Sequence, residues 1–344
     1  QFNYDEIINK NKDMLPFEYK WWATHAFHFT ALDNAISILK SGVLYSRIKA
    51  EQNSLMHNEN ASRAVISMTD FEVLSYVRFY FRPLTPTQYH NEGYKHPQLR
   101  YDSQGANISI PVFFVFRLNS LLADNKTAFS CKSKAGHNDE VLAGVEEFAG
   151  LNFEQIYASS YMTNSEEEKK YRQAEILYPD AYKIDDSLEV ILCRSEVERN
   201  TLLKKLKEED SKIYEKYKTL IKIGKRNVFQ NNGFFVKSVS YCDGRLDIFF
   251  NDSINKIRYT DRQVRRNEVT ELLPLQAEYI FEWKDCRGKQ ITMKHISQEL
   301  SYSTSGVTAQ PTTIPSAKVM SVEMYIDGEL LFSNDFDLSE SVIF

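Results

Sequence analysis

The chain has 344 residues, and its 42 Lys and Arg and 47 Asp and Glu give a formal net charge of −5. Hydrophobic residues make up 42% and charged residues 26%, which is ordinary for a globular protein. The longest apolar run, residues 111–116, is far shorter than the roughly 20 residues of a membrane-spanning helix. Residues 1–13 lack the basic-then-apolar order of a signal peptide, and the four cysteines lie far apart. We therefore predict a cytoplasmic protein with no membrane segment and no cysteine-based zinc or disulfide framework.

Basic residues concentrate in the middle of the chain. Residues 1–200 carry 21 basic and 27 acidic side chains, residues 201–300 carry 20 and 14, and residues 301–344 carry 1 and 6. A basic stretch of this kind is expected of a surface that binds a polyanion such as nucleic acid. A solvated helix surface would have the same composition, and charge alone favours that simpler interpretation.

The first periodic segment, residues 28–47, is expected to form a strand, a short helix and a second strand. Apolar residues recur at helical spacing from residue 32 to residue 39. Thr30 can cap the start of this helix, and Gly42 stands where a C-cap glycine belongs.

Strand composition and loops alternate in the next part of the chain. Residues 75–90 begin as a strand, which Pro83 and Pro86 then interrupt. A loop rich in Lys, Ser and Gly is expected at residues 125–139, and a helix near residue 151. Further strands are expected at residues 109–118, 174–179 and 187–194.

The last third of the chain is expected to be rich in strands. Two helical segments, residues 196–209 and 211–221, precede it and carry many lysines. Asp243-Gly244 and Asp327-Gly328 are typical of hairpin turns. Residues 301–315 are expected to form a long flexible loop. Strands are predicted at residues 234–241, 245–251, 277–283, 289–295, 317–326 and 329–334.

These patterns predict an α+β protein in three parts. Residues 1–195 form a mixed helix and strand domain, residues 196–227 a basic helical connector, and residues 228–344 an all-β, sandwich-like accessory domain.

The usual motifs of several enzyme classes are absent from the sequence. It contains no Gly-x-Gly pair, no Walker phosphate loop, no His-Glu-x-x-His and no Gly-x-Ser-x-Gly, and its seven histidines show no metal-ligand spacing. Most common nucleotide-binding and hydrolase chemistries therefore lack their signatures, and no metal is predicted.

Four segments together carry a more specific pattern. They are His28-Phe29-Thr30 with Asn34, the run Tyr76-Val77-Arg78-Phe79-Tyr80-Phe81 with Pro83 and Pro86, Tyr161 before an acidic turn, and Arg172-Gln173-Ala174-Glu175-Ile176-Leu177. In order and spacing this combination resembles the DarT family of NAD-dependent ADP-ribosyltransferases, toxins that modify bases in nucleic acid. The resemblance covers residues 27–180. It departs from the family pattern at Arg78, where the family tends to have Pro, and at Thr87-Gln88, where the family has an apolar pair.

The resemblance implies a fold and a reaction. The fold would be an ADP-ribosyltransferase-like split β-sheet core with flanking helices, placed in residues 1–195. The reaction would move ADP-ribose from NAD, as co-substrate, onto a base of single-stranded DNA and release nicotinamide. An intact duplex hides the Watson–Crick edges of its bases, so a single-stranded or flipped substrate is expected. A toxin–antitoxin or anti-phage role and a cognate antitoxin protein are also implied.

Glu175 is the predicted catalytic residue. Cleavage of the nicotinamide–ribose bond passes through an oxocarbenium-like transition state, close to that of glycoside cleavage. A carboxylate can stabilise the developing positive charge and accept a proton from the nucleophile. Glu175 would face the site if Ile176 and Tyr178 point the other way. By itself, Glu175 could equally be a surface residue on an edge strand.

Other residues would bind NAD. His28 and Thr30 are two apart on one strand and share a face, and the resemblance places the adenosine side of NAD there with Asn34 nearby. His28 alone would more often be a core histidine. Tyr80 could stack on the nicotinamide or fill the core.

The resemblance also implies an arginine and a substrate-binding surface. Arg63 is favoured as the arginine that holds the NAD phosphates or substrate, with Arg47 as the alternative. Tyr161 could contact a substrate base, or pack under its loop. Lys132 and Lys134, in a basic loop, could contact substrate phosphates or simply be solvated.

Three alternatives remain open at this point. RNA is a close variant of the acceptor, because the sequence does not distinguish it from DNA. A non-catalytic protein that recognises nucleic acid or a phage component would also fit the fold, although a retained Glu175 argues against it. Transfer to a protein side chain is a weaker third alternative.

Overall fold

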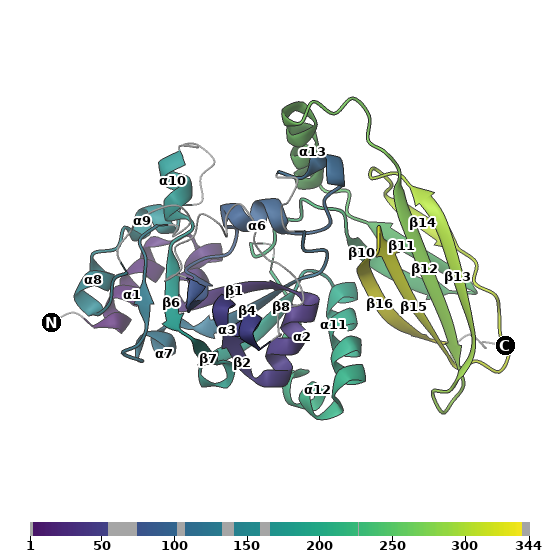
Figure 1. Ribbon diagram of the computed structural model, residues 1–344, viewed down its shortest axis with the longest axis horizontal. Helices are drawn as coiled ribbons and strands as arrows, with labels where there is room; N and C mark the ends of the chain where they lie inside the picture. The colour runs from purple at the N-terminus through teal and green to yellow at the C-terminus, as the bar shows by residue number, and fades with distance from the viewer. Residues whose placement is uncertain are drawn as a thin grey trace.

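The computed structural model describes residues 3–53, 74–101, 107–132, 141–158, 166–225 and 227–338. Mixed helices and strands form one half of the molecule and two antiparallel sheets form most of the other (Figure 1). In the described ranges, no helix has the length and apolar character needed to cross a membrane.

A seven-stranded sheet forms the centre of the first half, in the order β5-β6-β3-β1-β4-β8-β9. Six successive residues of β4 are buried, because both faces of the sheet are covered, and this explains the apolar run at residues 111–116. The neighbouring strands are antiparallel except for β8 and β9. Its strands are β1 (His25–Ala31), β3 (Tyr76–Tyr80), β4 (Pro111–Arg117), β5 (Ala128–Phe129), β6 (Glu175–Pro179), β8 (Leu188–Cys193) and β9 (Ile221–Ile223).

Short helices and a small two-stranded sheet surround this sheet. The small sheet pairs β2 (Val43–Tyr45) with β7 (Ala181–Lys183). The described helices of this half, up to residue 186, are α1 (Tyr4–Met14), η1 (Phe17–Thr24), α2 (Leu32–Ser41), α3 (Arg47–Gln52), α6 (Pro86–Asn91), η2 (Pro97–Leu99), α7 (Leu118–Leu122), α8 (Val145–Ala149), α9 (Phe153–Ile156), α10 (Glu166–Tyr171) and η3 (Ile184–Asp186).

The ends of α2 test two capping predictions. Gly42 is confirmed as the C-cap, in the left-handed region at a φ of 68°. The N-cap prediction was wrong, because Ala31 caps the helix and Thr30 lies inside β1. Strand β1 extends through Ala31, which pairs with Pro111, so the helix starts one residue later than predicted.

Helix α11 (Glu196–Glu209) confirms the first predicted helical segment, and α12 (Ser211–Tyr217) confirms the second as far as residue 217. The second segment was predicted to continue to residue 221, which instead begins β9. Leu202 and Leu206 of α11 belong to the hydrophobic core of the first half. On its other side, α11 contacts the C-terminal half, where Thr201 Oγ1 accepts a hydrogen bond of 3.0 Å from the Ser333 backbone N–H. In Figure 1, α11 lies between the seven-stranded sheet and the C-terminal sheets.

The C-terminal half contains the predicted antiparallel sheets. Both residues of the Asp243-Gly244 and Asp327-Gly328 turns have positive φ, as a type I′ hairpin turn requires. Their buried residues form a separate hydrophobic core. One sheet has the order β10-β11-β14 and the other β13-β12-β15-β16. The strands are β10 (Val236–Cys242), β11 (Arg245–Phe250), β12 (Leu275–Lys284), β13 (Gln290–Leu300), β14 (Gly306–Ala309), β15 (Val319–Ile326) and β16 (Glu329–Asp337).

Two features of this half differ from the prediction. The loop predicted at residues 301–315 contains β14, which pairs with β11, so the loop prediction was wrong for residues 306–309. Helix α13 (Ile254–Arg266) lies between β11 and β12, where no helix was predicted.

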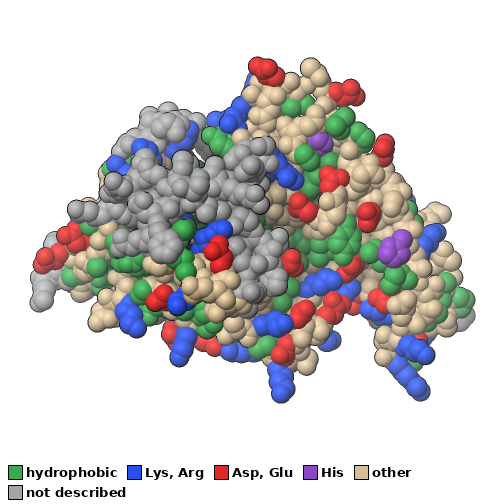
Figure 2. Space-filling view, viewed as in Figure 1, with side chains coloured by type: hydrophobic (Ala, Val, Ile, Leu, Met, Phe, Trp, Pro, Cys, Tyr) green, Lys and Arg blue, Asp and Glu red, His purple; other side chains and the backbone are tan. Residues whose placement is uncertain are grey.

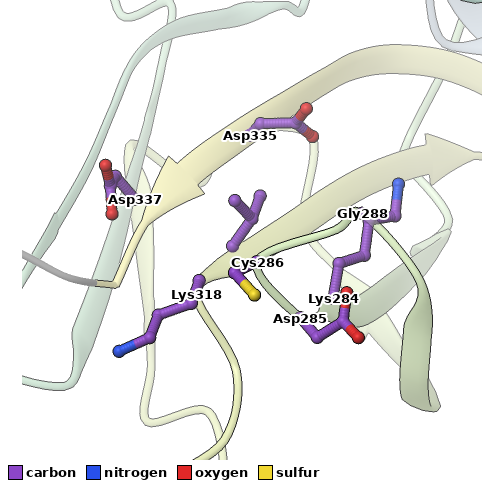
Figure 3. A pocket seen from close by; sticks show the side chains of 8 residues that line it. Lys284, Asp285, Cys286, Gly288, Lys318, Asp335 and Asp337 are labelled. Atoms are coloured by element: carbon purple, nitrogen blue, oxygen red, sulfur yellow. The ribbon is translucent and has the colours of Figure 1, made fainter.

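A hollow of about 500 Å³ lies where the β12–β13 turn meets the ends of β15 and β16 (Figure 3). Acidic and basic side chains are mixed in it, and its residues all come from the C-terminal half. Its lining residues are Lys284, Asp285, Cys286, Gly288, Lys318, Val319, Asp335 and Asp337.

Candidate active site

The pairing of β3 with β6 positions Glu175. Tyr80 lies opposite Glu175, and Phe79 lies opposite Ile176. Paired residues face the same side of a sheet and successive residues alternate. Glu175, Tyr80 and Arg78 therefore share one face, and Ile176 points to the other, as the alternation predicted.

The Glu175 side chain is buried and held in place by hydrogen bonds. It is 1% exposed, and Arg78 donates to both of its carboxylate oxygens, from Nε to Oε2 at 2.9 Å and from Nη2 to Oε1. The Glu175 backbone N–H donates to Ser130 Oγ at 3.2 Å. A forked guanidinium–carboxylate pair fixes both orientation and charge. The interpretation of Glu175 as a surface residue is therefore excluded.

Arg78 stands where the sequence departs from the family pattern. Its side chain is 26% exposed, so it covers the carboxylate and also reaches the surface of the site. Burial lowers the pKa of Arg78, the Glu175 carboxylate raises it, and the net shift is upward. The guanidinium therefore stays charged beside Glu175.

His28 bonds the same residue from the other side. Its Nδ1 donates to the Arg78 carbonyl oxygen at 3.0 Å. Burial lowers the pKa of His28, which favours a neutral ring with the proton on Nδ1 and an acceptor at Nε2. Arg78 therefore links the two residues for which the sequence evidence was strongest, His28 through its carbonyl and Glu175 through its guanidinium.

Tyr80 extends this group toward α6. Burial, followed by the charge of Glu175, raises the pKa of Tyr80 to about 12, so the phenol stays protonated. On α6, Thr87 Oγ1 donates to Gln173 Oε1 at 2.8 Å. This hydrogen bond connects α6 to the residues immediately before Glu175.

The residues that depart from the family pattern are hydrogen-bonded in this chain. Gln88, the neighbour of Thr87, is buried, and its Nε2 donates to Glu92 Oε2 at 2.6 Å and to the Val228 carbonyl at 2.8 Å. A polar Thr87-Gln88 pair is accommodated because each side chain is hydrogen-bonded, as burial of polar groups requires.

The structure places the other predicted residues as follows. Thr30 and Asn34 are buried, 1% and 8% exposed, on β1 and α2. Arg47 begins α3, and its Nε donates to Glu51 Oε1 at 2.9 Å. Lys132 Nζ lies 4.8 Å from the centre of the Tyr171 ring. The predictions for Arg63, Tyr161 and Lys134 fall outside the described residues. Among the described residues, no group of His, Cys, Asp and Glu could hold a metal ion.

Comparison with known proteins gives the family. A family model described as "ssDNA thymidine ADP-ribosyltransferase, DarT" matches residues 27–222, which is more than half of the chain. The molecule is thus an NAD-dependent ADP-ribosyltransferase. It belongs to the DarT family, whose members act on single-stranded DNA. The predicted family, reaction type and NAD co-substrate are confirmed.

Solved structures of DarT proteins also match. Thermus sp. 2.9 DarT in complex with ADP-ribosylated ssDNA is 20% identical, with a TM-score of 0.45, over 60% of this chain and 96% of that chain. The same protein in complex with NAD+ is 21% identical, with a TM-score of 0.41, over 58% and 92%. Thermosipho africanus DarTG in complex with ADP-ribose is 12% identical, with a TM-score of 0.43, over 63% and 53%. No curated protein matches the chain.

Proposed function

We propose that this chain transfers ADP-ribose from NAD to the thymine base of single-stranded DNA, with Glu175 as the catalytic carboxylate. The buried Glu175, held by Arg78 inside the region that matches the family, is the observation that supports this assignment most strongly.

The reaction places two demands on Glu175. As the bond between nicotinamide and the ribose C1′ breaks, positive charge develops on the ribose, and a nearby carboxylate stabilises it. A ring nitrogen of the base then bonds to C1′, and its proton passes to the carboxylate. Thymine has no exocyclic amine, so this nitrogen is its ring N–H.

The hydrogen bonds from Arg78 still allow the Glu175 carboxylate to stabilise the ribose and to accept the proton. A carboxylate has about four lone-pair positions, and the two hydrogen bonds from Arg78 use two of them. The remaining positions can accept from the ribose 2′-hydroxyl and from the base. Arg78 is therefore a positioning residue that holds the buried carboxylate in one orientation.

The other site residues take roles around this centre. We assign the adenosine side of NAD to His28, Thr30 and Asn34, and the nicotinamide to the ring of Tyr80. Arg63, with Arg47 as the alternative, would hold the phosphates.

Substrate contacts are proposed for Tyr161, Lys132 and Lys134. The split-sheet ADP-ribosyltransferase core, a toxin role with a protein antitoxin or in anti-phage defence, and a cytoplasmic location belong to the same proposal.

A labelling experiment tests the assignment of the acceptor. The full chain is incubated with labelled NAD and, separately, with single-stranded DNA containing only one type of base, with duplex DNA, with RNA and with a protein mixture. We expect label only on single-stranded DNA that contains thymidine, and none with Glu175→Gln. Label on RNA or protein but not on DNA would overturn the proposal.

A further inference from the structure

Helix α13 has an exposed basic face. Its sequence, Ile254–Arg266, contains five basic side chains and one acidic side chain, a net charge of +4. Lys256, Tyr259 and Gln263 are buried on one side. The basic residues on the exposed side, which we call the α13 surface, are Arg258, Arg262, Arg265 and Arg266.

The helix is fixed to both halves of the molecule. Lys256 Nζ donates to the Tyr302 carbonyl at 2.7 Å in the C-terminal half. The buried Tyr259 ring lies 5.2 Å from the ring of Tyr89 on α6. Just after the helix, Asn267 Nδ2 donates to the carbonyl of Arg100 at 3.0 Å. The α13 surface is therefore held at a defined place beside residues 86–101, which follow the active-site strand β3.

Helix α6 connects this place to the active site. Thr87 and His90 are three residues apart and so are neighbours on one face of α6. Thr87 bonds Gln173, two residues before Glu175. The His90 ring lies 4.1 Å from the Tyr101 ring, and Arg266 Cζ lies 3.7 Å from the centre of that same ring.

Basic groups converge around His90. Burial first, and then the charges of Lys95, Arg262, Arg266 and Lys169, lower the pKa of His90 to about 3. Lys169 belongs to α10, so positive charge from α10 and α13 meets at α6. These three helices lie along one edge of the molecule (Figure 1), and Lys and Arg side chains are visible along that edge (Figure 2).

We propose that the α13 surface binds the phosphates of the nucleotides that flank the target base in single-stranded DNA. This inference rests on the proposed function, because it assumes that the polyanion near Glu175 is DNA. From Arg258 to Arg266 the helix extends about 12 Å at 1.5 Å per residue. That length matches about three stacked nucleotides at roughly 3.4 Å each. The surface is built from residues beyond the region that matches the family, so it extends the substrate contacts of the family domain.

Salt-dependent binding tests the surface on the full chain. The variant Arg258→Ala/Arg262→Ala/Arg265→Ala removes three exposed charges and keeps Arg266, whose Nη1 donates to the Tyr101 carbonyl. The control Arg287→Ala/Lys289→Ala/Lys294→Ala removes three exposed charges from the distant β12–β13 hairpin. Fluorescence anisotropy, without NAD, measures the affinity of each protein for a 12-nucleotide thymidine-containing strand, from 50 to 200 mM salt.

Each neutralised phosphate of a single strand contributes about 0.7 to the slope of log affinity against log salt. Loss of three contacts should therefore reduce the steepness of the slope for the 12-mer by about 2. Between 50 and 200 mM salt, the affinity of the α13 variant should then fall by a factor roughly 20-fold smaller than that of the unmodified protein. The control should retain the slope of the unmodified protein. Equal slopes for the α13 variant and the control would overturn the inference. Labelling of DNA by the unmodified protein is measured separately, so a failure of the proposed function is distinguishable from a failure of the surface.

Discussion

Replacing Arg78 tests whether this residue positions the buried Glu175 carboxylate for catalysis. In Arg78→Met, Glu175 loses its forked partner while the aliphatic stem is largely retained. Breaking a buried ion pair costs about 3–5 kcal/mol. Since the Arg78 side chain is 26% exposed, we expect the lower end, about 3 kcal/mol. Loss of the fork also lets the carboxylate leave its catalytic orientation. A misplacement of about 1 Å can cost on the order of 10²-fold in rate, so we expect kcat/KM to fall by about that factor.

The assay is kcat/KM for labelling a thymidine-containing strand. Arg78→Lys is the matched variant, because it keeps the charge and loses the fork, and it should lower kcat/KM by less. Thermal melts of each variant at pH 8 separate misfolding from loss of function. An Arg78→Met enzyme that folds and has an unchanged kcat/KM would refute the positioning role.

Three further predictions follow from the fold and the site. Thr87→Val should leave the melting temperature within a few degrees and lower kcat/KM by less than about tenfold, because it removes the hydrogen bond from Thr87 to Gln173, two residues before Glu175. A steady-state assay with NAD measures this. A chain ending at residue 195 should lose cooperative unfolding by circular dichroism, because it lacks Leu202 and Leu206 of the first core and the edge strand β9; a cooperative melt would contradict this. The pKa of His90 is about 3 in the folded protein, below the usual value near 6.5, so the unfolded chain takes up a proton first and stability should fall as pH decreases from 6.5 toward 3. His90→Phe should lessen the decrease in melting temperature between pH 7 and pH 5, and an unchanged decrease would exclude His90 as its source.

Features set by local sequence were predictable. The strands around Glu175 and the hairpin at Asp327-Gly328 follow from short-range composition, and the structure contains both. Strand β14 was missed because it lies in a segment rich in Ser, Thr and Pro, and its pairing with β11 comes from backbone hydrogen bonds over a long sequence distance. Helix α13 was missed for a related reason. Its buried side contains Lys256 and Gln263 beside Tyr259, whereas Ile254 and Ile257 are exposed, so its apolar residues do not mark the buried face.

The candidate site was likewise only partly predictable from the sequence. The resemblance selected Glu175 and His28 from motifs along the chain, but Arg78 appeared only as a departure from a pattern. Its partner Glu175 is 97 residues away in the sequence, and only the pairing of β3 with β6 brings them together. Burial of the carboxylate, which distinguishes a site residue from a surface one, is likewise a property of the folded sheet.

The most direct test of the central claim is single-turnover transfer of ADP-ribose from NAD to a thymidine-containing strand by Glu175→Gln. Glu154→Gln, which changes an exposed glutamate on α9, is the matched control. Loss of the proton acceptor alone should slow transfer by about 10²–10⁴-fold, and loss of charge stabilisation should slow it further. NAD affinity should remain within a few fold, and the control should transfer at the normal rate. A near-normal transfer rate in Glu175→Gln would contradict the assignment of Glu175 as the catalytic carboxylate.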